Sequence, residues 1–485
     1  MTPVFDPLHL QAATLDVMAA AHATPSLLAQ RQQQRLVRLL DAARYGSAFY
    51  GERLGAVAGR GNHLAHVAPV TRAELMDRFD DWVTDPALRL DELRDFTADP
   101  SRVGEAWQGR YVVWESSGTS SLPGIFVQDA PAMAVYDALE AVRHRAPGKG
   151  GGRMFGPFSA LEALGGGDRM AMVTATGGHF ASVVSFERLR SINPWMAQTA
   201  RSFSLLQPID ALVAALNEFR PTVLATYPTA AAMLADEAAA GRLHISPRAV
   251  MTGGETMGAA AREHIRHSFD TAVRASYGAS EFLPIAWECA HGHLHVNEDW
   301  VILEPVDERY RPVPRGHASH TVLLTNLANL VQPLIRYDLG DQVTLHAKRC
   351  ACGSPLPTLE LGGRSDDVLR VPSRRRKGET VSLLPMALCT VIEEECKLFD
   401  FQLQQHDDHT LVLRIPHDGS EGRAAIARCR SALQAFATAQ GAEPIKVLGE
   451  TGCAVPRGRS GKACRMVMGA DADRPAMHDD VLGVA

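Results

Sequence analysis

Residues 223–252 read VLATYPTAAAMLADEAAAGRLHISPRAVMT, and this stretch decides the fold class. It begins with an apolar run over Val223 to Tyr227, continues with an Ala/Leu-rich helical stretch over 229–240, and ends with a second apolar run over Ala249 to Thr252. Short apolar runs that alternate with helical stretches are typical of an α/β domain with a substantial parallel sheet. The alternation extends over residues 110–345, with further strand-like runs at Tyr111 to Trp114, Met170 to Thr174 and Val322 to Asn326.

The regions on either side of this alternation have a different character. Residues 26–43 carry leucines at helical spacing among polar residues, which predicts an amphipathic helix. Thr71-Arg72-Ala73-Glu74 has the spacing of a capping box, so we expect another helix to begin there. After Gly362-Gly363-Arg364 the chain becomes charged and hinge-like, and mixed α and β patterns follow. Because 485 residues exceed one ordinary core, we predict two domains, residues 1–364 and 365–485.

The composition is that of an ordinary globular protein. Hydrophobic residues make up 46% of the chain and charged residues 21%, and the net charge of −6 argues against a non-specific nucleic-acid binder. We see neither a secretory signal nor an apolar run long enough to span a membrane, so we expect a cytoplasmic location. In that compartment the eight cysteines should be reduced thiols or metal ligands.

Loops rich in glycine and hydroxyl groups follow several of the expected strands. Ser116 to Gly124 reads SSGTSSLPG, a composition that can hold phosphate oxygens, although it is not a Walker loop and a polar turn is the alternative. Gly253-Gly254-Glu255 follows the run that ends at Thr252. In Tyr277-Gly278-Ala279-Ser280-Glu281, the tyrosine ring can lie against a nucleobase and the glutamate can hold Mg²⁺.

Three later segments complete the pattern. Arg336 to Asp341 reads RYDLGD and offers an acidic group suited to two ribose hydroxyls, and Gly363 to Asp367 reads GRSDD. Pro456 to Arg465 reads PRGRSGKACR, a basic loop that presents Lys462. Each segment alone is common, but their order along one chain indicates a site that uses ATP.

These segments resemble the signature motifs of the adenylate-forming superfamily of acyl-coenzyme A synthetases, carrier-protein adenylation domains and luciferases. Within it the chain is most similar to the phenylacetate–coenzyme A ligase-like family, over residues 40–470. The stretches that indicate this branch are Ala48-Phe49-Tyr50, Pro69 to Leu75, Leu294 to Asp299 and Pro333 to Tyr337. The resemblance implies a large N-terminal domain of mixed β-sheets flanked by helices, and a small mobile α+β C-terminal domain.

The resemblance also implies a role for each motif residue. Ser116, Ser117, Gly118 and Thr119 would cradle the ATP phosphates, and Gly253, Gly254 and Glu255 would line the adenine and acyl region. Tyr277, beside Gly278, would stack on adenine, Ser280 would touch the α-phosphate and Glu281 would bind Mg²⁺. Asp341 and Arg364 would hold the ribose, Asp366 would be the hinge, and Lys462 would bridge the acyl carboxylate and the α-phosphate.

The implied activity is ATP-dependent activation of an aryl or arylacetic acid to an acyl adenylate, followed by transfer to coenzyme A. Lys462 would offset charge on both reactants, and Mg²⁺ would neutralise the departing pyrophosphate. A free-standing adenylation enzyme that loads a carrier protein is the closest alternative. A nucleotide-binding protein with structural zinc and impaired catalysis is an alternative of another class. The basic run Arg374 to Lys377 does not decide the acceptor, and the sequence leaves a homodimer open.

The chain departs from the superfamily pattern at Gly124. The superfamily commonly has a lysine immediately after the proline of the phosphate loop, where this chain has Gly124. Relatives in the phenylacetate branch often lack that lysine too. The β- and γ-phosphates are therefore left to Mg²⁺, backbone amides and basic groups that the sequence does not identify.

Four residues in two segments predict a structural zinc site. Cys289 and His295 lie in one segment and Cys350 and Cys352 in another, and three thiolates with one imidazole complete a tetrahedral set. His291 and His293 compete for the fourth position, and free cysteines are the alternative. The other five cysteines are interpreted as structural.

Two loops are candidates for the acyl pocket. His179 and Phe180 follow the expected strand that ends at Thr174, and Tyr227 follows the next one. For His179 a purely structural role is the alternative. For Tyr227 the alternative is a strand-to-helix turn with Thr229 as the N-cap.

Overall fold

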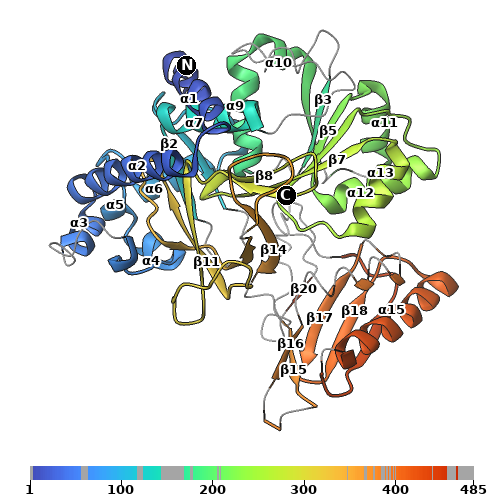
Figure 1. Ribbon diagram of the computed structural model, residues 1–485. Helices are drawn as coiled ribbons and strands as arrows, with labels where there is room; N and C mark the ends of the chain where they lie inside the picture. Colours follow the sequence, from blue (N-terminus) through green and yellow to red (C-terminus); the bar gives the residue numbers. More distant parts are fainter. Residues whose placement is uncertain are drawn as a thin grey trace, which may run out of the picture.

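A computed structural model describes residues 4–55, 64–116, 124–143, 169–174, 178–204, 207, 209–346, 348–364, 369–374, 377–378, 380–383, 388, 391–392, 395–396, 398, 400–439, 441–455 and 466–467. These residues form two lobes (Figure 1). We call the described residues up to 364 the large lobe and those from 369 onward the small lobe. No helix among the described residues is long and apolar enough to cross a membrane.

The large lobe is organised by a nine-stranded sheet, in the order β13-β14-β9-β8-β7-β6-β5-β3-β4. One half is parallel and consists of β3 (Met170–Thr174), β4 (Ala200–Ser204), β5 (Val223–Thr226), β6 (Ala249–Thr252) and β7 (Ala272–Ala279). The other half is antiparallel and adds β8 (Phe282–Glu288), β9 (Leu294–Val296), β13 (Asp341–Leu345) and β14 (Thr358–Arg364). Several sequence motifs lie at the ends of these strands: Glu255 follows β6, Tyr277 lies near the end of β7, and Arg364 ends β14.

Helices cover the parallel half of the sheet. They are α9 (Ala181–Ile192), α10 (Pro194–Thr199), α11 (Ile209–Phe219), α12 (Pro228–Ala239) and α13 (Ala259–Phe269). Leu216, Leu234 and Ile265 of these helices form one buried cluster with Leu224 of β5 and Val250 of β6. Because strands with both faces buried read as continuous apolar runs, this layer explains the sequence pattern that predicted the sheet.

The rest of the large lobe is mainly helical. Its helices are α1 (Pro7–Ala20), α2 (Pro25–Gly46), α3 (Ala48–Gly55), α4 (Arg72–Asp77), α5 (Phe79–Trp82), α6 (Leu90–Thr97) and α7 (Ala130–Arg143), with 3-10 turns at Leu64–His66 and Pro100–Arg102. This region also contains two small antiparallel sheets. One is formed by β1 (Val112–Glu115) and β2 (Ile125–Gln128), and the other by β10 (Val301–Val306), β11 (Thr321–Asn326) and β12 (Tyr337–Asp338). Trp82, Trp114 and Phe282 are fully buried in the shared core.

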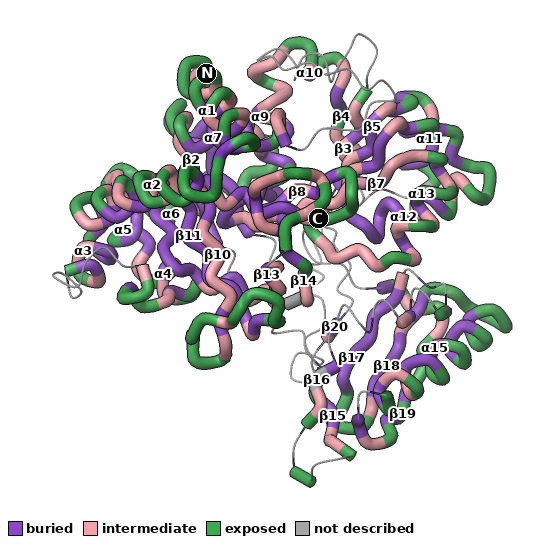
Figure 2. Tube along the Cα trace, viewed as in Figure 1, coloured by how far each residue is buried: buried purple, intermediate pink, exposed green. Residues whose placement is uncertain are grey.

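The small lobe has its own core. A hairpin of β15 (Leu369–Pro372) and β16 (Thr380–Leu383) adjoins a sheet of β17 (Gln402–Asp407), β18 (Thr410–Arg414), β19 (Lys446–Glu450) and β20 (Met466–Val467), with helix α15 (Gly419–Ala439). Leu383, Phe401 and Leu433 belong to a buried cluster whose members all lie between residues 369 and 466. In Figure 2 the outer face of α15 is exposed, whereas most of β17 and β18 is buried.

The predicted fold class is confirmed: a large α/β part with mixed sheets is followed by a small α+β part. The expected runs at 111–114 and 322–326 are strands, but they belong to the small antiparallel sheets and not to the parallel half. Residues 365–368, which contain the predicted hinge Asp366, and residues 456–465, which contain Lys462, lie outside the described residues. The division at residues 364 and 365 therefore stays a prediction.

Candidate active site

The candidate site begins at the carboxyl ends of the parallel strands, the edge where open α/β sheets bind ligands. Thr174 ends β3 and Tyr227 follows β5, and their side-chain hydroxyl oxygens lie 2.8 Å apart. Glu255 follows β6, and its Oε2 accepts a hydrogen bond of 3.2 Å from the backbone N–H of Thr229, in the first turn of α12. The structure thus brings Tyr227 and Glu255, predicted from separate segments, to one edge of the sheet.

Two polar atoms at this edge are buried without a partner among the described residues. They are Oε1 of Glu255 and Oγ1 of Thr229. Thr229 lies in the first turn of α12, as the turn interpretation expected, but the N-cap is Tyr227 and its side chain makes no capping bond. A buried polar atom without a partner is unfavourable, so these atoms suit a ligand that brings its own hydrogen-bond donor and acceptor.

A tight turn between β7 and β8 carries the Tyr277 to Glu281 motif. The pairing of the two strands shifts between Tyr277 and Ala279. A Cβ at Gly278 would lie 1.8 Å from the carbonyl oxygen of Leu283, so only glycine fits there. Trp114 Nε1 donates a 2.8 Å hydrogen bond to the carbonyl oxygen of Ser280, which fixes this turn to the end of β1.

The side chains of Tyr277 and Asp341 form a hydrogen bond with each other. The Tyr277 hydroxyl donates to Oδ2 of Asp341 at 2.7 Å, and the tyrosine is buried. On the adjoining strands the backbone of Arg364 lies directly opposite Asp341. Residues predicted to hold adenine and ribose therefore meet at one place, although they are separated by more than sixty positions in the sequence.

The ends of the predicted phosphate loop are held together. The backbone N–H of Ser116 donates to the carbonyl oxygen of Gly124, and the N–H of Gly124 donates to Oγ of Ser116, both at 2.8 Å. Ser117, Gly118 and Thr119 lie outside the described residues. Arg72 Nη1 lies 3.4 Å from Oγ of Ser116. No local pattern predicts this contact, because the partners are 44 positions apart in the sequence.

Three further predicted residues, Glu281, His179 and Phe180, are buried, whereas Gly254 is exposed and Gly253 and Ser280 are partly exposed. Glu281 is buried, and its carbonyl oxygen accepts a 3.1 Å hydrogen bond from Nδ2 of Asn326. His179 is fully buried with its ring 5.2 Å from that of Phe96, and burial lowers the pKa of this imidazole. Phe180 packs against Val183 and Val103. The acyl-pocket role of His179 and Phe180 stays a prediction.

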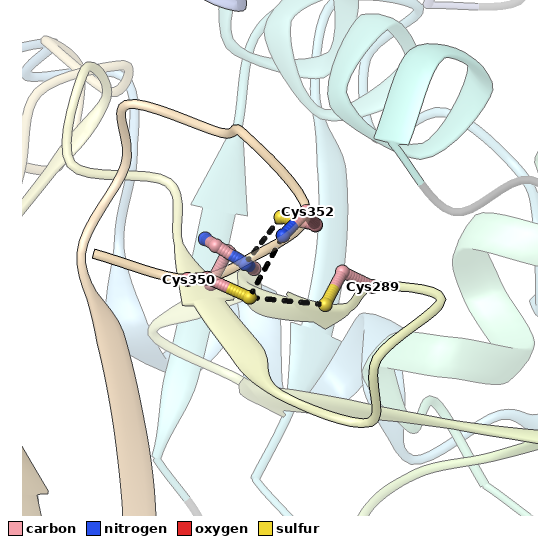
Figure 3. Close-up of side chains that lie close together, drawn as sticks. Cys289, Cys350 and Cys352 are labelled. Carbon is pink, nitrogen blue, oxygen red and sulfur yellow. Dashed lines mark hydrogen bonds between the residues drawn. The ribbon is translucent and has the colours of Figure 1, made fainter. Parts of the chain in front are cut away.

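The four predicted metal ligands form a cluster. The ligand atoms of Cys289, His295, Cys350 and Cys352 all lie within 4.8 Å of one another, the arrangement shown in part in Figure 3. Sulfur and nitrogen at zinc-binding distances in a tetrahedron would lie about 3.8 Å apart for two sulfurs and about 3.6 Å for sulfur and nitrogen. The observed distances are 3.8 Å between the sulfurs of Cys289 and Cys350, and 3.2 Å from Sγ of Cys352 to Nε2 of His295. The sulfur–sulfur distance matches a tetrahedral zinc ion, whereas the sulfur–nitrogen distance is shorter than that geometry gives.

His295 completes this cluster, and neither of its competitors belongs to the group. Its Nδ1 lies 2.9 Å from the carbonyl oxygen of Leu356, which orients the ring so that Nε2 faces the thiols. Burial lowers the pKa of His295, which favours the neutral form of the imidazole that binds metals. His293 Nδ1 approaches Cys350 Sγ at 3.6 Å but does not join the group of four, and His291 does not join it either.

The cluster lies at the far end of β8 from the nucleotide motif. Cys289 follows the last residue of β8, whereas Glu281 precedes its first residue. A strand of this length spans roughly 20 Å. An ion there could join two loops, but it is too distant to act on a substrate beside Glu281.

The sheet, the two lobes and the motif positions together define the fold of the adenylate-forming acid–coenzyme A ligases. Among solved structures the chain superposes on 2-hydroxyisobutyryl-CoA ligase in the postadenylation state with an acyl-AMP. The TM-score is 0.66 at 18% identity, over 90% of this chain and 89% of that one. Against the anthranilate CoA ligase AuaEII with anthranoyl-AMP the TM-score is 0.52 at 17% identity, over 73% of this chain and 64% of that one.

The other comparisons give weaker likenesses or none. The 2-hydroxyisobutyryl-CoA ligase gives lower TM-scores in its open conformation (0.53) and its thioesterification state (0.51) than in the postadenylation state. In sequence, the chain is 28% identical to protein CapK of Staphylococcus aureus over 133 residues, which is 27% of this chain and 28% of CapK. No family model matches the chain.

Proposed function

We propose that the chain is an ATP-dependent ligase that activates a carboxylic acid as an acyl adenylate and transfers the acyl group to a thiol. The observation that carries the proposal is the meeting of Tyr277, Asp341 and the backbone of Arg364 beside the turn that bears Glu281. This is the set that the motifs assign to adenine, ribose and magnesium. The likeness in fold to ligases whose structures contain acyl-AMP supports the same reading.

In the first half-reaction, the acid's carboxylate oxygen would attack the α-phosphorus of ATP. A P–O bond forms, the bond to the β-phosphate oxygen breaks, and pyrophosphate leaves. Ser116 to Thr119 would hold the phosphates, Ser280 would contact the α-phosphate, and Lys462 would stabilise the charge that develops there. Mg²⁺ held by Glu281 would supply charge neutralisation for the pyrophosphate.

In the second half-reaction, a thiolate would attack the acyl carbon and release AMP. Between the two steps the adenylate must be shielded from water, which closure of the small lobe over the site would provide. We propose that residues 365–485 form the moving domain and that Asp366 is its hinge. The separate core of the small lobe supports such a rigid unit.

For the acid we propose an aryl or arylacetic acid, and for the acceptor coenzyme A. Tyr227, Glu255 and Thr229 would line the acyl side together with Phe180. The buried oxygens of Glu255 and Thr229 favour an acid that carries a hydrogen-bonding substituent. The cysteine usage supports a reducing, cytoplasmic location.

For the Cys289, His295, Cys350 and Cys352 cluster we propose a structural Zn²⁺ ion. The supporting observation is the match between the sulfur–sulfur distance of 3.8 Å and tetrahedral zinc geometry. When bound, the ion would join the turn after β8 to the loop between β13 and β14. Metal analysis of protein purified without chelator should give one zinc per chain.

Acid-dependent exchange of radioactive pyrophosphate into ATP tests the adenylation step directly. We expect exchange with at least one member of a panel of aryl, arylacetic and aliphatic acids, each tested with and without a hydroxyl or amino substituent. Adding coenzyme A or a phosphopantetheinylated carrier protein then separates the two acceptors. Tight ATP binding without exchange for any acid would instead favour a nucleotide-binding protein that lacks ligase activity.

A further inference from the structure

Glu255 is held at the carboxyl edge of the sheet by the residues before it and by helix α12. A Cβ on Gly253 would lie 2.7 Å from Oγ of Ser276 on β7, and Gly254 has a positive φ of 79°. Both positions therefore favour glycine, and they set the path of the chain from β6 to Glu255. Oε2 of Glu255 then accepts the N–H of Thr229 at 3.2 Å, which supplies the side-chain cap that α12 otherwise lacks.

This cap uses only one of the two carboxylate oxygens. Oε1 of Glu255 and Oγ1 of Thr229 are both buried without a partner among the described residues, and Thr229 as a whole is only 8% exposed. The N-terminal end of a helix stabilises a negative charge, so α12 favours the ionised form of Glu255. An ionised carboxylate oxygen can only accept hydrogen bonds, and leaving it unpaired in a buried place is unfavourable. Oε1 therefore suits a ligand group that donates a hydrogen bond.

The phenol of Tyr227 lies near this carboxylate and is uncharged. Burial raises the pKa of Tyr227 to about 12, and the charge of Glu255 adds to the shift, so the phenol keeps its proton at neutral pH. Its hydroxyl oxygen lies 2.8 Å from Oγ1 of Thr174. Tyr227 and Thr174 therefore form a polar, neutral wall beside the carboxylate of Glu255.

The position of Glu255 in the sheet suits the far end of an aromatic acid. Because Glu255 bonds to the first turn of α12, which follows β5, its carboxylate lies near the end of β5. Strand β6 separates β5 from β7, the strand that leads into Ser280. Two strand spacings amount to about 10 Å. A benzene ring with substituents at opposite ends, one of them bonded at each side, spans a comparable length.

We propose that Glu255 determines the acid specificity, and that the preferred acid carries a hydroxyl or amino group across an aromatic ring from its carboxylate. This inference rests on the proposed ligase function. The hydroxyl or amino group donates a hydrogen bond to Oε1 of Glu255, and Oγ1 of Thr229 bonds to the same group. An acid without a donor at this position leaves the buried carboxylate oxygen unpaired, and this penalty is the source of the discrimination.

The test is acid-dependent pyrophosphate exchange by the full-length chain with matched para-substituted benzoates and phenylacetates. The substituents are hydroxyl and amino, which donate hydrogen bonds, methoxy, which only accepts them, and methyl, which does neither. We expect kcat/KM for the better of the hydroxyl and amino acids to exceed that for the methyl and methoxy acids by about 10- to 100-fold. This is the usual effect of a hydrogen bond to a charged group.

An amide at position 255 reverses the direction of the hydrogen bond to the acid. In Glu255→Gln the amide oxygen still accepts the N–H of Thr229, but the amide nitrogen replaces Oε1 and donates. The preference should shift toward the methoxy acid. Thr229→Val leaves Glu255 in place and should reduce the wild-type preference by a smaller factor. Glu237→Gln makes the same carboxylate-to-amide change elsewhere on α12, where Glu237 pairs with Arg242, and should keep the wild-type preference.

The exocyclic amino group of adenine is the other donor that could reach Glu255, and the test separates it from the acid. Inosine triphosphate lacks this amino group. If Glu255 binds the acid, Glu255→Gln leaves the ratio of the ATP and inosine triphosphate affinities, measured by calorimetry, unchanged. A loss of affinity confined to ATP would assign the carboxylate to adenine and overturn the inference.

The inference is also overturned if the methyl acid is used as well as the hydroxyl and amino acids, or if Glu255→Gln slows exchange equally with all of them. Exchange with aliphatic acids alone would contradict it too. In each of these cases exchange still occurs, so the ligase function stands. ATP binding without exchange for any acid would contradict the ligase function, and with it this inference.

Discussion

The buried ion pair between Arg143 and Asp299 gives a stability prediction whose size follows from its geometry. Arg143 donates from Nη1 and Nη2 to the two oxygens of Asp299 at 2.7 and 2.8 Å, and from Nη1 to Oδ1 of Asn297 at 2.6 Å. The two charged side chains are 4% and 0% exposed. Replacing Arg143 by Met leaves a buried carboxylate without its counter-ion, which costs about 3–5 kcal/mol.

Urea unfolding followed by tryptophan fluorescence measures this change. All six tryptophans precede residue 365, so their emission reports the large lobe and not the small one. We expect the unfolding midpoint of Arg143→Met to fall by the equivalent of about 3–5 kcal/mol. The double variant Arg143→Met with Asp299→Leu should recover most of the loss, since an apolar pair can replace a buried ion pair at little cost.

A matched control tests whether the loss of stability comes from breaking a buried ion pair or from removing any arginine. Arg89 pairs with Asp80 on the surface, so Arg89→Met should not shift the midpoint. Our reasoning would be refuted if Arg143→Met behaved like this control, or if the double variant were no more stable than the single one. Asn297 and Asp299 follow directly after β9, which carries His295, so zinc should also be lost more readily from the single variant.

Lys462→Ala should slow adenylation by orders of magnitude and affect thiol transfer from preformed acyl-AMP much less; equal loss in both half-reactions, measured separately, would contradict its assigned role. Cys352→Ser should abolish the bound zinc measured by mass spectrometry, whereas Cys453→Ser, outside the cluster, should retain one ion per chain. Tyr277→Phe keeps the ring but removes the hydrogen bond to Asp341, and should weaken ATP and AMP binding alike by about tenfold. An unchanged AMP affinity in that variant would show that the bond does not support the nucleotide site.

The sequence predicted the elements whose signals are local. The strand at Ala249–Thr252 has the predicted limits because an apolar run with both faces buried needs no further information. The helix expected over 229–240 begins one residue earlier, because Pro228 occupies its first position and proline is favoured there. Thr71 caps α4 as its spacing indicated.

Features that depend on pairing between distant segments could not be predicted. The runs at 111–114 and 322–326 read as strands, but only the three-dimensional pairing assigns them to small antiparallel sheets. His295, and not His291 or His293, completes the metal cluster because it pairs with Thr358 on β14. The spacing of residues within 289–295 does not predict this pairing. The sequence places Arg72 only at the start of a helix. Its contact with Ser116 could not be predicted, because the two residues are 44 positions apart.

The thiol and imidazole cluster at the end of β8 also offers a fixed reference point for measuring motion. Cobalt(II) bound by three thiolates and one imidazole would absorb visible light and be paramagnetic, and it would be attached rigidly to the large lobe. Cys453 of the small lobe is partly exposed and lies outside the cluster, so a spin label there would move with the other lobe. A change in the distance between the two spins during turnover would test the proposed movement of the lobes, and an unchanged distance would contradict it.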